Sequence, residues 1–542
     1  MRTRFTLSLL LAFLALTIAM TWPLLSPTAR VLPNTDDAFF GVWRLAWFAH
    51  QLPRDPWHLF DANMFHPAPG TLAFSDAMVL VSALGAPAIW SGVSAPFVHN
   101  LLMGAAFVSS MWFAFVLVRD LTQSPAAAWI AAIIFGFAPY RIIHLGHLEL
   151  QWMMWMPLSV WLLHRLVAVP SAGRALALGG AVACQTFSSI YYGAFLSLYL
   201  VAAMLMLLAF NRPTRRRVVR LAPLAVLPLL AVVLIYGPPY WQSRTQHGPR
   251  SVAEITEYSA TPADFLRVPP SNWLRGRPAG RAAGEERSLF PGAVAIMLAT
   301  AAFVPPIAPP TWMYVGLTAL SVDAALGMNG VLFPLLHRVA PPITSLRSPA
   351  RFGAFVLLSI AVLAGLGAAR ISRARPQFAV PLAIAATVLC LVEYWSGPMG
   401  ARPNQDRPTD AHQFLASQPP GTVSIEMPVP RPDALWLWET TYQIRSIHHW
   451  QPLVNGYSGF APADYLQTLE RLRGFPDETS IERLRELEVR YVLLNRVFYT
   501  GEEFTDLIAR LTRSPAFGPS RAFGAGDNQI VIVEMMDIPA PR

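Results

Sequence analysis

Long apolar runs recur through the first 395 residues and leave this chain very few possible folds. A helix that crosses a bilayer needs about 20 consecutive, mostly apolar residues. Because lipid offers the backbone no hydrogen-bond partners, such segments cross as helices. The chain is therefore predicted to be an α-helical, polytopic membrane protein. About eleven spanning helices are expected, near residues 5–23, 97–118, 126–140, 152–168, 174–189, 193–210, 221–237, 289–304, 311–327, 351–369 and 377–395.

Two apolar segments need separate treatment. The first run follows a basic start at residues 1–4 and could be a signal peptide. It ends at residues 21–23 without a small-x-small cleavage site, which favours an uncleaved first helix. The segment from Met78 to Trp90 is short and is interrupted by a glycine and a proline. It is typical of an interfacial or re-entrant helix.

The distribution of arginine predicts the orientation. The net charge of +9 comes from arginine alone, since the sequence contains no lysine. If the spans alternate, five arginine clusters fall on one side, which should be the cytoplasm. This pattern explains the charge better than a nucleic-acid-binding face does. The clusters are Arg2 with Arg4, Arg119, residues 165–174, residues 212–220 and residues 370–375.

The opposite, exported side then receives the first long loop, residues 24–96, and the tail. The tail, residues 396–542, has shorter apolar runs of strand length at 422–427, 489–494 and 529–534. Helical patterns lie between them at 462–474, 479–487 and 502–513. Strands that alternate with helices predict a small exported α/β domain. Residues 1–395 form the transmembrane domain in this division of the chain.

Two adjacent acids, Asp36 and Asp37, stand a few residues beyond the first span. Carboxylates are costly near a bilayer unless they bind something. One of them could remove a proton from an acceptor hydroxyl, or could bind a hard cation such as Mg²⁺ or Mn²⁺. The alternative is a structural one, in which either acid caps a helix that starts at Ala38.

A second set of ionisable residues leaves the third span on the exported side. It holds Arg141, His144, His147 and Glu149 within nine residues, where charged groups are expensive. The two histidines would share a helix face. Glu149 joins them only if Gly146 breaks the helix. The alternative is an interfacial histidine belt with Arg141 reaching lipid headgroups.

Arg347 and Arg351 precede the tenth span on the exported side, against the arginine bias. A guanidinium fork matches phosphate oxygens, so a lipid phosphate or pyrophosphate is the natural partner. Ordinary snorkelling toward headgroups is the alternative. Weaker signals are Tyr191 with Tyr192 after the fifth span, Glu285 with Glu286 before the eighth, and the aromatic loop 455–460.

Other chemistries find little support in the sequence. It contains no Walker-type phosphate loop, no His-Glu-x-x-His and no nucleophile elbow. The two cysteines, Cys184 and Cys390, lie in apolar runs and imply neither a disulfide framework nor a thiolate metal site. The ionisable residues gather at one membrane face, whereas a transporter would usually carry them at the midplane.

In their order and placement, these motifs resemble the GT-C superfamily of polytopic glycosyltransferases. Asp36 and Asp37 match its acidic motif after the first helix. The segment 138–149 is similar to the Ser-Pro-x-Tyr-x-x-Arg, Gly, acid pattern of oligosaccharyltransferase catalytic subunits, although it is compressed and Ala138 replaces the serine. Segments 57–63, 144–149, 346–352 and 455–457 resemble poorly characterised bacterial membrane proteins that are grouped as glycosyltransferases.

The resemblance implies an inverting transfer of a sugar from a polyprenyl-phosphate donor to a glycan, lipid or protein acceptor of the cell envelope. The site would face outward from a bacterial plasma (inner) membrane whose cytoplasmic side carries the N-terminus. Asp37 or Asp36 would be the base, with Asp37 favoured by analogy. The expected substrate-binding residues are Arg141, His144, His147, Glu149, Arg347, Arg351, Tyr191 and Tyr192.

The resemblance leaves two questions open. Metal dependence varies within the superfamily, so a divalent cation on Asp37, His147 and Glu149 is one alternative, and orientation of the donor by the same residues is the other. The second question is whether the chain is an enzyme. A non-catalytic protein with this scaffold could bind a lipid-linked glycan for assembly or export.

Overall fold

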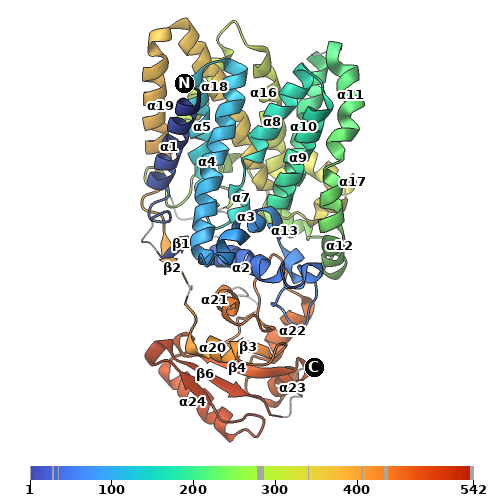
Figure 1. The fold of residues 1–542 in the computed structure, drawn as a ribbon, viewed down its shortest axis with the longest axis vertical. Helices are drawn as coiled ribbons and strands as arrows, with labels where there is room; N and C mark the ends of the chain where they lie inside the picture. Colours follow the sequence, from blue (N-terminus) through green and yellow to red (C-terminus); the bar gives the residue numbers. More distant parts are fainter. Residues whose placement is uncertain are drawn as a thin grey trace.

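The computed structural model describes residues 2–26, 30–33, 36–210, 212–276, 286–339, 341–404, 407–431 and 438–536. A bundle of long helices forms one part of the elongated molecule, and a small sheet with its own helices lies beyond one end of the bundle (Figure 1). We call residues 396–536 the C-terminal region. The long helix α2 (Asp36–Gln51) lies across the bundle end between the two parts.

Ten of the eleven apolar runs each fall on one helix, and the run 221–237 is shared by two. The helices concerned are α1 (Arg2–Met20), α4 (Ala95–Thr122), α5 (Pro125–Phe137), α8 (Trp155–Ala168), α9 (Ala172–Ser188), α10 (Ile190–Phe210), α11 (Arg212–Val226), α12 (Leu229–His247), α15 (Ala293–Thr300), α16 (Pro309–Leu326), α18 (Gly353–Ala374) and α19 (Ala379–Tyr394).

The expected number of spans is not confirmed. By length and composition, five helices in the described part of the chain can cross a bilayer, or up to seven if each of two bent pairs is one span. Some of the helices are simply short, such as α15 with 8 residues. The run 221–237 is divided between α11 and α12, which meet at an angle of 40° at Pro228. Proline lacks the N–H that would continue the hydrogen-bond ladder.

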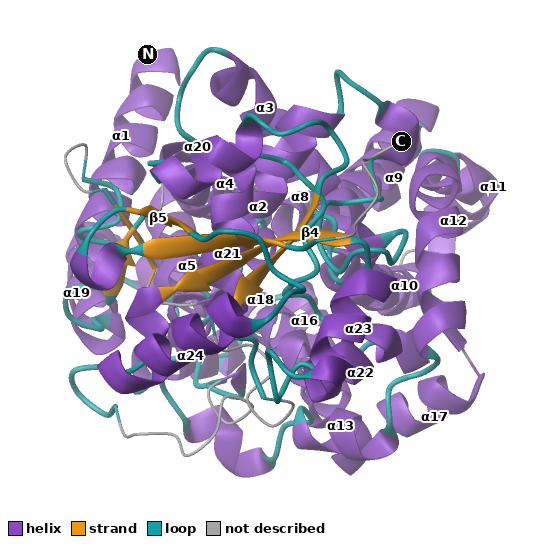
Figure 2. Cartoon of the chain, turned by 90° about the horizontal axis from the view of Figure 1, so that it is seen from below, coloured by secondary structure: helices purple, strands orange, loops and turns teal. Residues whose placement is uncertain are grey.

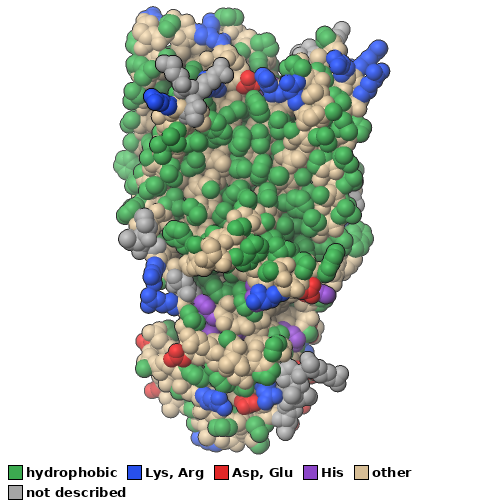
Figure 3. Space-filling view, viewed as in Figure 1, with side chains coloured by type: hydrophobic (Ala, Val, Ile, Leu, Met, Phe, Trp, Pro, Cys, Tyr) green, Lys and Arg blue, Asp and Glu red, His purple; other side chains and the backbone are tan. Residues whose placement is uncertain are grey.

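Helix α18 forms the centre of the bundle. It is almost entirely buried and packs against α5, α15 and α16. Gly367 permits the closest approach, since a Cβ there would lie 1.9 Å from the carbonyl oxygen of Leu298. Small residues of this kind let membrane helices pack backbone to backbone. On the face that Figure 3 shows, hydrophobic side chains cover the bundle, and a set of arginines lies at its end away from the C-terminal region.

Short elements cover the bundle end that faces the C-terminal region. Helix α3 (Val79–Trp90), the expected interfacial segment, packs on α2. The others are α6 (Pro139–Ile143), α7 (Leu148–Gln151), α13 (Val252–Glu257), α17 (Leu332–Val339) and the 3₁₀ turn η7 (Pro349–Phe352). Strand β1 (Val31–Pro33) pairs antiparallel with β2 (Ala401–Pro403), so the start of the C-terminal region is tied to the first long loop.

The C-terminal region contains a four-stranded mixed sheet in the order β3-β4-β6-β5. Its strands are β3 (Val423–Met427), β4 (Val489–Asn495), β5 (Arg521–Phe523) and β6 (Ile530–Glu534). Strand β4 pairs in parallel with β3 and antiparallel with β6. The three predicted strands are thus present, as are the predicted helices, α22 (Ala463–Arg471), α23 (Glu478–Glu486) and α24 (Gly501–Arg513).

Alternation along the strands sends side chains to two helix layers, which Figure 2 shows on either side of the sheet. Tyr491 and Leu493 pack under α20 (Asp410–Ala416), whereas Val492 and Leu494 belong to the core that includes α22, α23 and α24. Helix α21 (Glu439–Arg445) packs against α2, and its Ile444 lies in a hydrophobic cluster with residues of α2. The C-terminal region therefore reaches the start of α2, where the two acids lie.

Candidate functional site

A cavity of about 460 Å³ lies where the ends of the membrane helices meet the C-terminal region. Cavities of this size hold small ligands. Its lining comes from α2, α7 and the loop 457–460, and from α10, α12 and the segment 343–351. The polar side chains that line it include Asp37, Asp76, His147, Glu149, Tyr191, Arg244, Arg250, Arg347, Arg351 and Tyr457.

Asp37 and Asp36 occupy the first turn of α2, but only Asp37 lines the cavity. Asp37 accepts a hydrogen bond from the hydroxyl of Tyr457 at 2.9 Å, and its side chain is 31% exposed. Successive helix residues point about 100° apart. Asp36 accordingly turns away and accepts hydrogen bonds from Arg402 at 3.1 Å and Thr440 at 3.0 Å.

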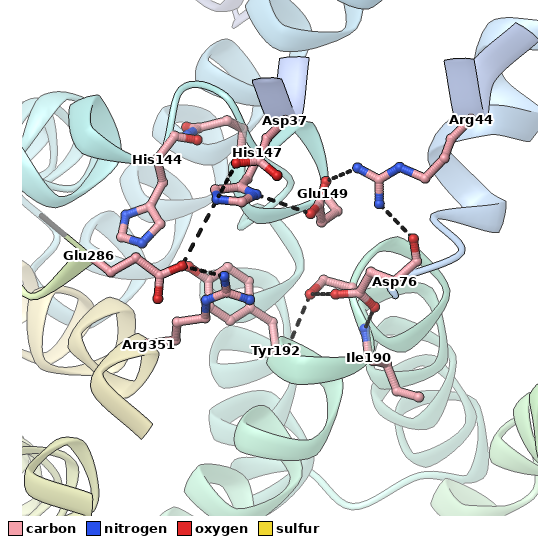
Figure 4. Close-up of polar contacts among 12 residues, drawn as sticks. Asp37, Arg44, Asp76, His144, His147, Glu149, Ile190, Tyr192, Glu286 and Arg351 are labelled. Atoms are coloured by element: carbon pink, nitrogen blue, oxygen red, sulfur yellow. Dashed lines mark hydrogen bonds and ion pairs between the residues drawn. The ribbon is translucent and has the colours of Figure 1, made fainter. Parts of the chain in front are cut away.

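His147 links Asp37 to a buried ion pair (Figure 4). Its Nε2 lies 3.4 Å from Asp37 Oδ2, and its Nδ1 lies 3.6 Å from Glu149 Oε1. The other oxygen of Glu149 accepts a hydrogen bond from Arg44 at 2.7 Å, and Arg44 also donates to the backbone oxygen of Asp76 at 2.6 Å. This chain of contacts fixes the carboxylates relative to one another.

The contacts explain the protonation of both groups. Burial lowers the pKa of His147, but the carboxylates of Asp37 and Glu149 outweigh it and raise this pKa above its ordinary value. Burial acts to raise the pKa of Glu149, yet Arg44 and His147 hold it well below the ordinary range. The neighbouring carboxylates thus favour the cationic form of His147, and Arg44 and His147 favour the anionic form of Glu149.

A clamp between Arg141 and Gln151 shapes the loop that carries these residues. Arg141 is fully buried and donates to the side chain and the backbone of Gln151, at 3.1 and 2.8 Å. Gln151 in turn donates to the backbone oxygen of His144 at 2.8 Å. Helix α6 ends at Ile143 as a result, and a turn brings His147 to the start of α7. The predicted helix break is present, and it places His147 next to Glu149.

Four of the predicted site residues lie outside the cavity: Asp36, Arg141, His144 and Tyr192. Tyr192 is buried and shares a hydrogen bond of 2.8 Å with the hydroxyl of Tyr140. His144 hydrogen-bonds the backbone oxygen of Tyr140 at 2.8 Å. Their role in substrate binding stays a prediction, and the contacts they make here are with the protein itself.

Arg351 and Arg347 line the cavity, with different partners. Arg351 donates to Glu286 at 2.6 Å, and Ser348 donates to the other oxygen of that carboxylate at 2.7 Å. Burial opposes the charge of Glu286, but Arg351 outweighs it and holds the pKa of this carboxyl well below its ordinary range. Arg347 lies 4.0 Å from Glu254 and is 28% exposed. Arg347 is thus the more available cation of the two.

Two further arginines, which the sequence analysis did not single out, also line the cavity. Arg250 pairs with Glu254 at 2.9 Å, so Arg250 and Arg347 share that carboxylate and together exceed its charge. Arg244 donates to Thr344 at 3.0 Å and to Ser345 at 2.7 Å. This part of the lining is positively charged and shares the cavity with Asp37. Arg244 and Arg250 precede the short helix α13 in the sequence, and no motif or periodic pattern there marks them as site residues.

The sequence analysis also passed over Arg44, Asp76 and the role of Glu286. A lone arginine within the apolar helix α2 was a signal that could have revealed Arg44. Asp76 accepts hydrogen bonds from Ser189 at 3.0 Å and from the backbone nitrogen of Ile190 at 2.6 Å. Burial and the charge of Glu149 raise the pKa of Asp76 to about 6. Glu285, which was noted beside Glu286, lies outside the described residues.

The donor set of Asp37, His147 and Glu149 does not fit a metal ion as it stands. Over the described part of the chain, no three His, Cys, Asp or Glu side chains are grouped to hold one. The ring of His147 occupies the space between the two carboxylates, and Glu149 is already paired with Arg44.

No protein-family model matches the chain, and no curated protein sequence is similar to it. The chain aligns with several solved structures. The apo oligosaccharyltransferase of Archaeoglobus fulgidus shares 14% identity over 98% of this chain and 75% of that chain, with a TM-score of 0.48. The same protein in complex with Zn and sulfate shares 15% identity over 96% and 74%, with a TM-score of 0.45. Apo ArnT from Cupriavidus metallidurans shares 13% identity over 100% of both chains, with a TM-score of 0.49.

The oligosaccharyltransferase and ArnT are GT-C glycosyltransferases, the superfamily that the motifs of this sequence resemble. All three TM-scores lie below 0.5. At that level the likeness carries no inference about activity, substrate or metal. The functional proposal rests on the cavity.

Proposed function

We propose that this protein is an inverting glycosyltransferase that moves a sugar from a polyprenyl-phosphate donor to a hydroxyl of a cell-envelope acceptor. One observation carries the proposal: a partly exposed carboxylate, Asp37, and several arginines, among them Arg250 and Arg347, line the same cavity. Such a site offers a base for the acceptor and cations for a phosphate leaving group. These are the two functions that this transfer requires.

The mouth of the cavity supports a lipid-linked donor. Trp241 of α12 lines the cavity and is 68% exposed, and the apolar residues Val233 and Leu234 of the same helix are exposed as well. A prenyl chain could lie against this apolar helix surface while its phosphate reaches the arginines. Long exposed apolar side chains of this kind are typical of a surface that faces lipid.

In the proposed reaction, Asp37 takes the proton of the acceptor hydroxyl as its oxygen bonds to the anomeric carbon. The bond from that carbon to the phosphate oxygen breaks, and the phosphate keeps the electron pair. Arg347 and Arg250 stabilise the negative charge on the phosphate. The carboxylates of the cavity favour the positive charge that develops on the sugar ring. His147 and Arg44 hold those carboxylates in place.

The proposed location is a bacterial plasma membrane, with the cavity and the C-terminal region exported and the N-terminus cytoplasmic. The supporting observation is the collection of arginines at the opposite end of the bundle (Figure 3). The acceptor, a glycan, lipid or protein, would approach from the exported side.

The adjacent acids provide a matched test. Asp37→Asn should reduce transfer by roughly 10²- to 10⁴-fold, which is the usual contribution of a general base. Asp36→Asn removes the same charge one residue away and should leave transfer within about twofold of wild type. The measurement is turnover of prenyl-phosphate glucose, galactose, mannose and arabinose by purified protein, with retained thermal stability as the control. Full activity of Asp37→Asn would contradict the proposal and favour a non-catalytic glycan-binding protein.

A further inference from the structure

The loop 455–460 brings the C-terminal region into the cavity and is held from its own side. Glu439 accepts hydrogen bonds from the backbone nitrogen of Gly456 at 2.7 Å and from the side chain of Asn455 at 3.2 Å. Gln443 accepts one from the backbone nitrogen of Tyr457 at 3.2 Å. Both acceptors belong to α21, which packs on α2. The position of Tyr457 is therefore set relative to the helix that carries Asp37.

The other end of the loop is fixed to the membrane part of the chain. Arg250 donates to the backbone oxygen of Gly459 at 2.5 Å, and its guanidinium lies 3.4 Å above the centre of the Phe460 ring. The ring of His247 also packs on Phe460, with centres 4.8 Å apart. A loop held at both ends forms a wall of the cavity and directs Tyr457 inward.

The hydroxyl of Tyr457 makes the contact that an acceptor would need. It donates to Asp37 Oδ1 at 2.9 Å, and the ring packs edge-on against Phe40 with centres 5.4 Å apart. A general base must lie within about 2.6–3.2 Å of the oxygen whose proton it removes. Burial and the charge of Asp37 raise the pKa of Tyr457 well above its ordinary value. The phenol therefore keeps its proton when it donates to Asp37.

We propose that Tyr457 occupies the place of the acceptor hydroxyl on Asp37 and keeps water from that place until an acceptor displaces it. Tyr457 is then the residue that favours transfer over hydrolysis of the donor. In hydrolysis, a water oxygen would bond to the anomeric carbon, its proton would pass to Asp37, and the phosphate would leave with the electron pair. This inference rests on the proposed function, because it concerns the same base and the same donor.

The test compares Tyr457→Phe and Tyr457→Ala with the control Tyr499→Phe. Tyr499 lies after β4 in the C-terminal region, away from Asp37, and belongs to no part of the site. Purified protein is incubated with the prenyl-phosphate sugar that wild type turns over, without acceptor, and free sugar is measured. We expect release to rise roughly tenfold in Tyr457→Ala and several-fold in Tyr457→Phe, since a lost hydrogen bond is worth about this factor. Tyr499→Phe should match wild type.

A second readout needs no substrate. Asp37 is labelled with a water-soluble carbodiimide and an amine, and the modified fraction is measured by mass spectrometry. Labelling of Asp37 should rise in both Tyr457 variants, while labelling of Asp36 should stay as in wild type. Tyr457→Phe keeps the ring and the packing on Phe40, so it reports on the hydroxyl if Tyr457→Ala fails to fold.

The two proposals fail differently. If wild type turns over a donor but neither Tyr457 variant releases more sugar, or if Tyr457→Phe loses transfer and hydrolysis alike, Tyr457 is not a barrier to water and this inference is wrong. If wild type turns over none of the donors, or if Asp37→Asn stays fully active, the proposed function is wrong as well.

Discussion

The acidic side chains of the cavity differ in the partners that stabilise their negative charge. Glu149 and Glu286 each have an arginine within 2.7 Å, so their negative charges are satisfied inside the protein. Asp76 is equally buried, but its hydrogen-bond donors are Ser189 and the backbone nitrogen of Ile190. Two neutral donors stabilise a carboxylate less than an ion pair does. Asp76 is therefore the acid here whose charge costs stability.

This difference predicts a pH dependence for Asp76→Asn. The pKa of Asp76 is raised from 3.8 to about 6, so the folded protein binds an extra proton between those values and the acid form favours folding. That stabilisation is lost as the pH rises through 6. Between pH 7.5 and pH 5, wild type should gain about 1.4 kcal/mol relative to the variant, one pKa unit. Thermal unfolding of both proteins in detergent measures this.

Asn cannot titrate, so the variant shows how the other acids alone change the stability with pH. If the stability difference between the two proteins is the same at both pH values, the Asp76 carboxyl is not perturbed. If wild type loses stability relative to the variant at pH 5, the sign of the shift is wrong.

At the scale of the elements, the loop 455–460 packs closely against the first long loop. A Cβ added to Gly456 would lie 2.7 Å from the ring of Phe65, and Phe65 itself packs against Phe74 and Tyr465. The ring has little room to move, because its neighbours are buried aromatic side chains. A glycine is needed at this point for close approach.

Gly456→Ala should accordingly destabilise the protein by about 1–3 kcal/mol, the usual cost of overpacking. Because the same loop carries Tyr457, the variant should also release more free sugar from the donor. Thermal unfolding and the hydrolysis assay are the two measurements. Gly173→Ala, in α9 with open space around it, is the control and should be neutral. Unchanged melting of Gly456→Ala would contradict this account of the interface.

How much of the fold the sequence could predict varies from element to element. Each apolar run became a helix, and the tail strands at 422–427, 489–494 and 529–534 appeared within one or two residues, because both rest on local periodicity. The number of membrane spans could not be predicted from the apolar runs, because the kink at Pro228 and the length of α15 depend on neighbouring helices.

The same limit applies to the site. Asp37, His147, Glu149, Arg347 and Arg351 line one cavity, and all belong to segments that the arginine distribution assigns to the same side of the membrane. Sequence spacing could not separate Asp37 from Asp36, because that choice depends on α2 starting at residue 36. Nor could it show that Gln151 would hydrogen-bond the buried Arg141, or that Tyr457 would hydrogen-bond Asp37, which lies 420 residues earlier in the chain.

At the scale of the whole molecule, the two ends of the bundle differ in charge. Arginines gather at the end remote from the cavity, and the C-terminal region covers the other end (Figure 3). The positive-inside rule places the arginine-rich end in the cytoplasm. Two exposed positions lie at opposite ends: Arg216 in α11 and Arg473 after α22.

Labelling of single cysteines tests this orientation. Arg473→Cys should react with a membrane-impermeant maleimide in intact spheroplasts, whereas Arg216→Cys should react only after the membrane is permeabilised. The native Cys184 and Cys390 are replaced by alanine beforehand. Labelling in the reverse pattern would mean that the cavity faces the cytoplasm, and the proposed use of exported acceptors would be wrong.

The central claim is that one cavity holds both a lipid phosphate, on its arginines, and a base. A cryo-electron-microscopy map of the full chain in lipid nanodiscs with polyprenyl phosphate bound tests it most directly. The account predicts the phosphate within hydrogen-bond distance of Arg347 and Arg250, the prenyl chain along α12 near Trp241, and Asp37 across the remaining space. A phosphate bound elsewhere, with these arginines still paired to Glu254, would contradict it.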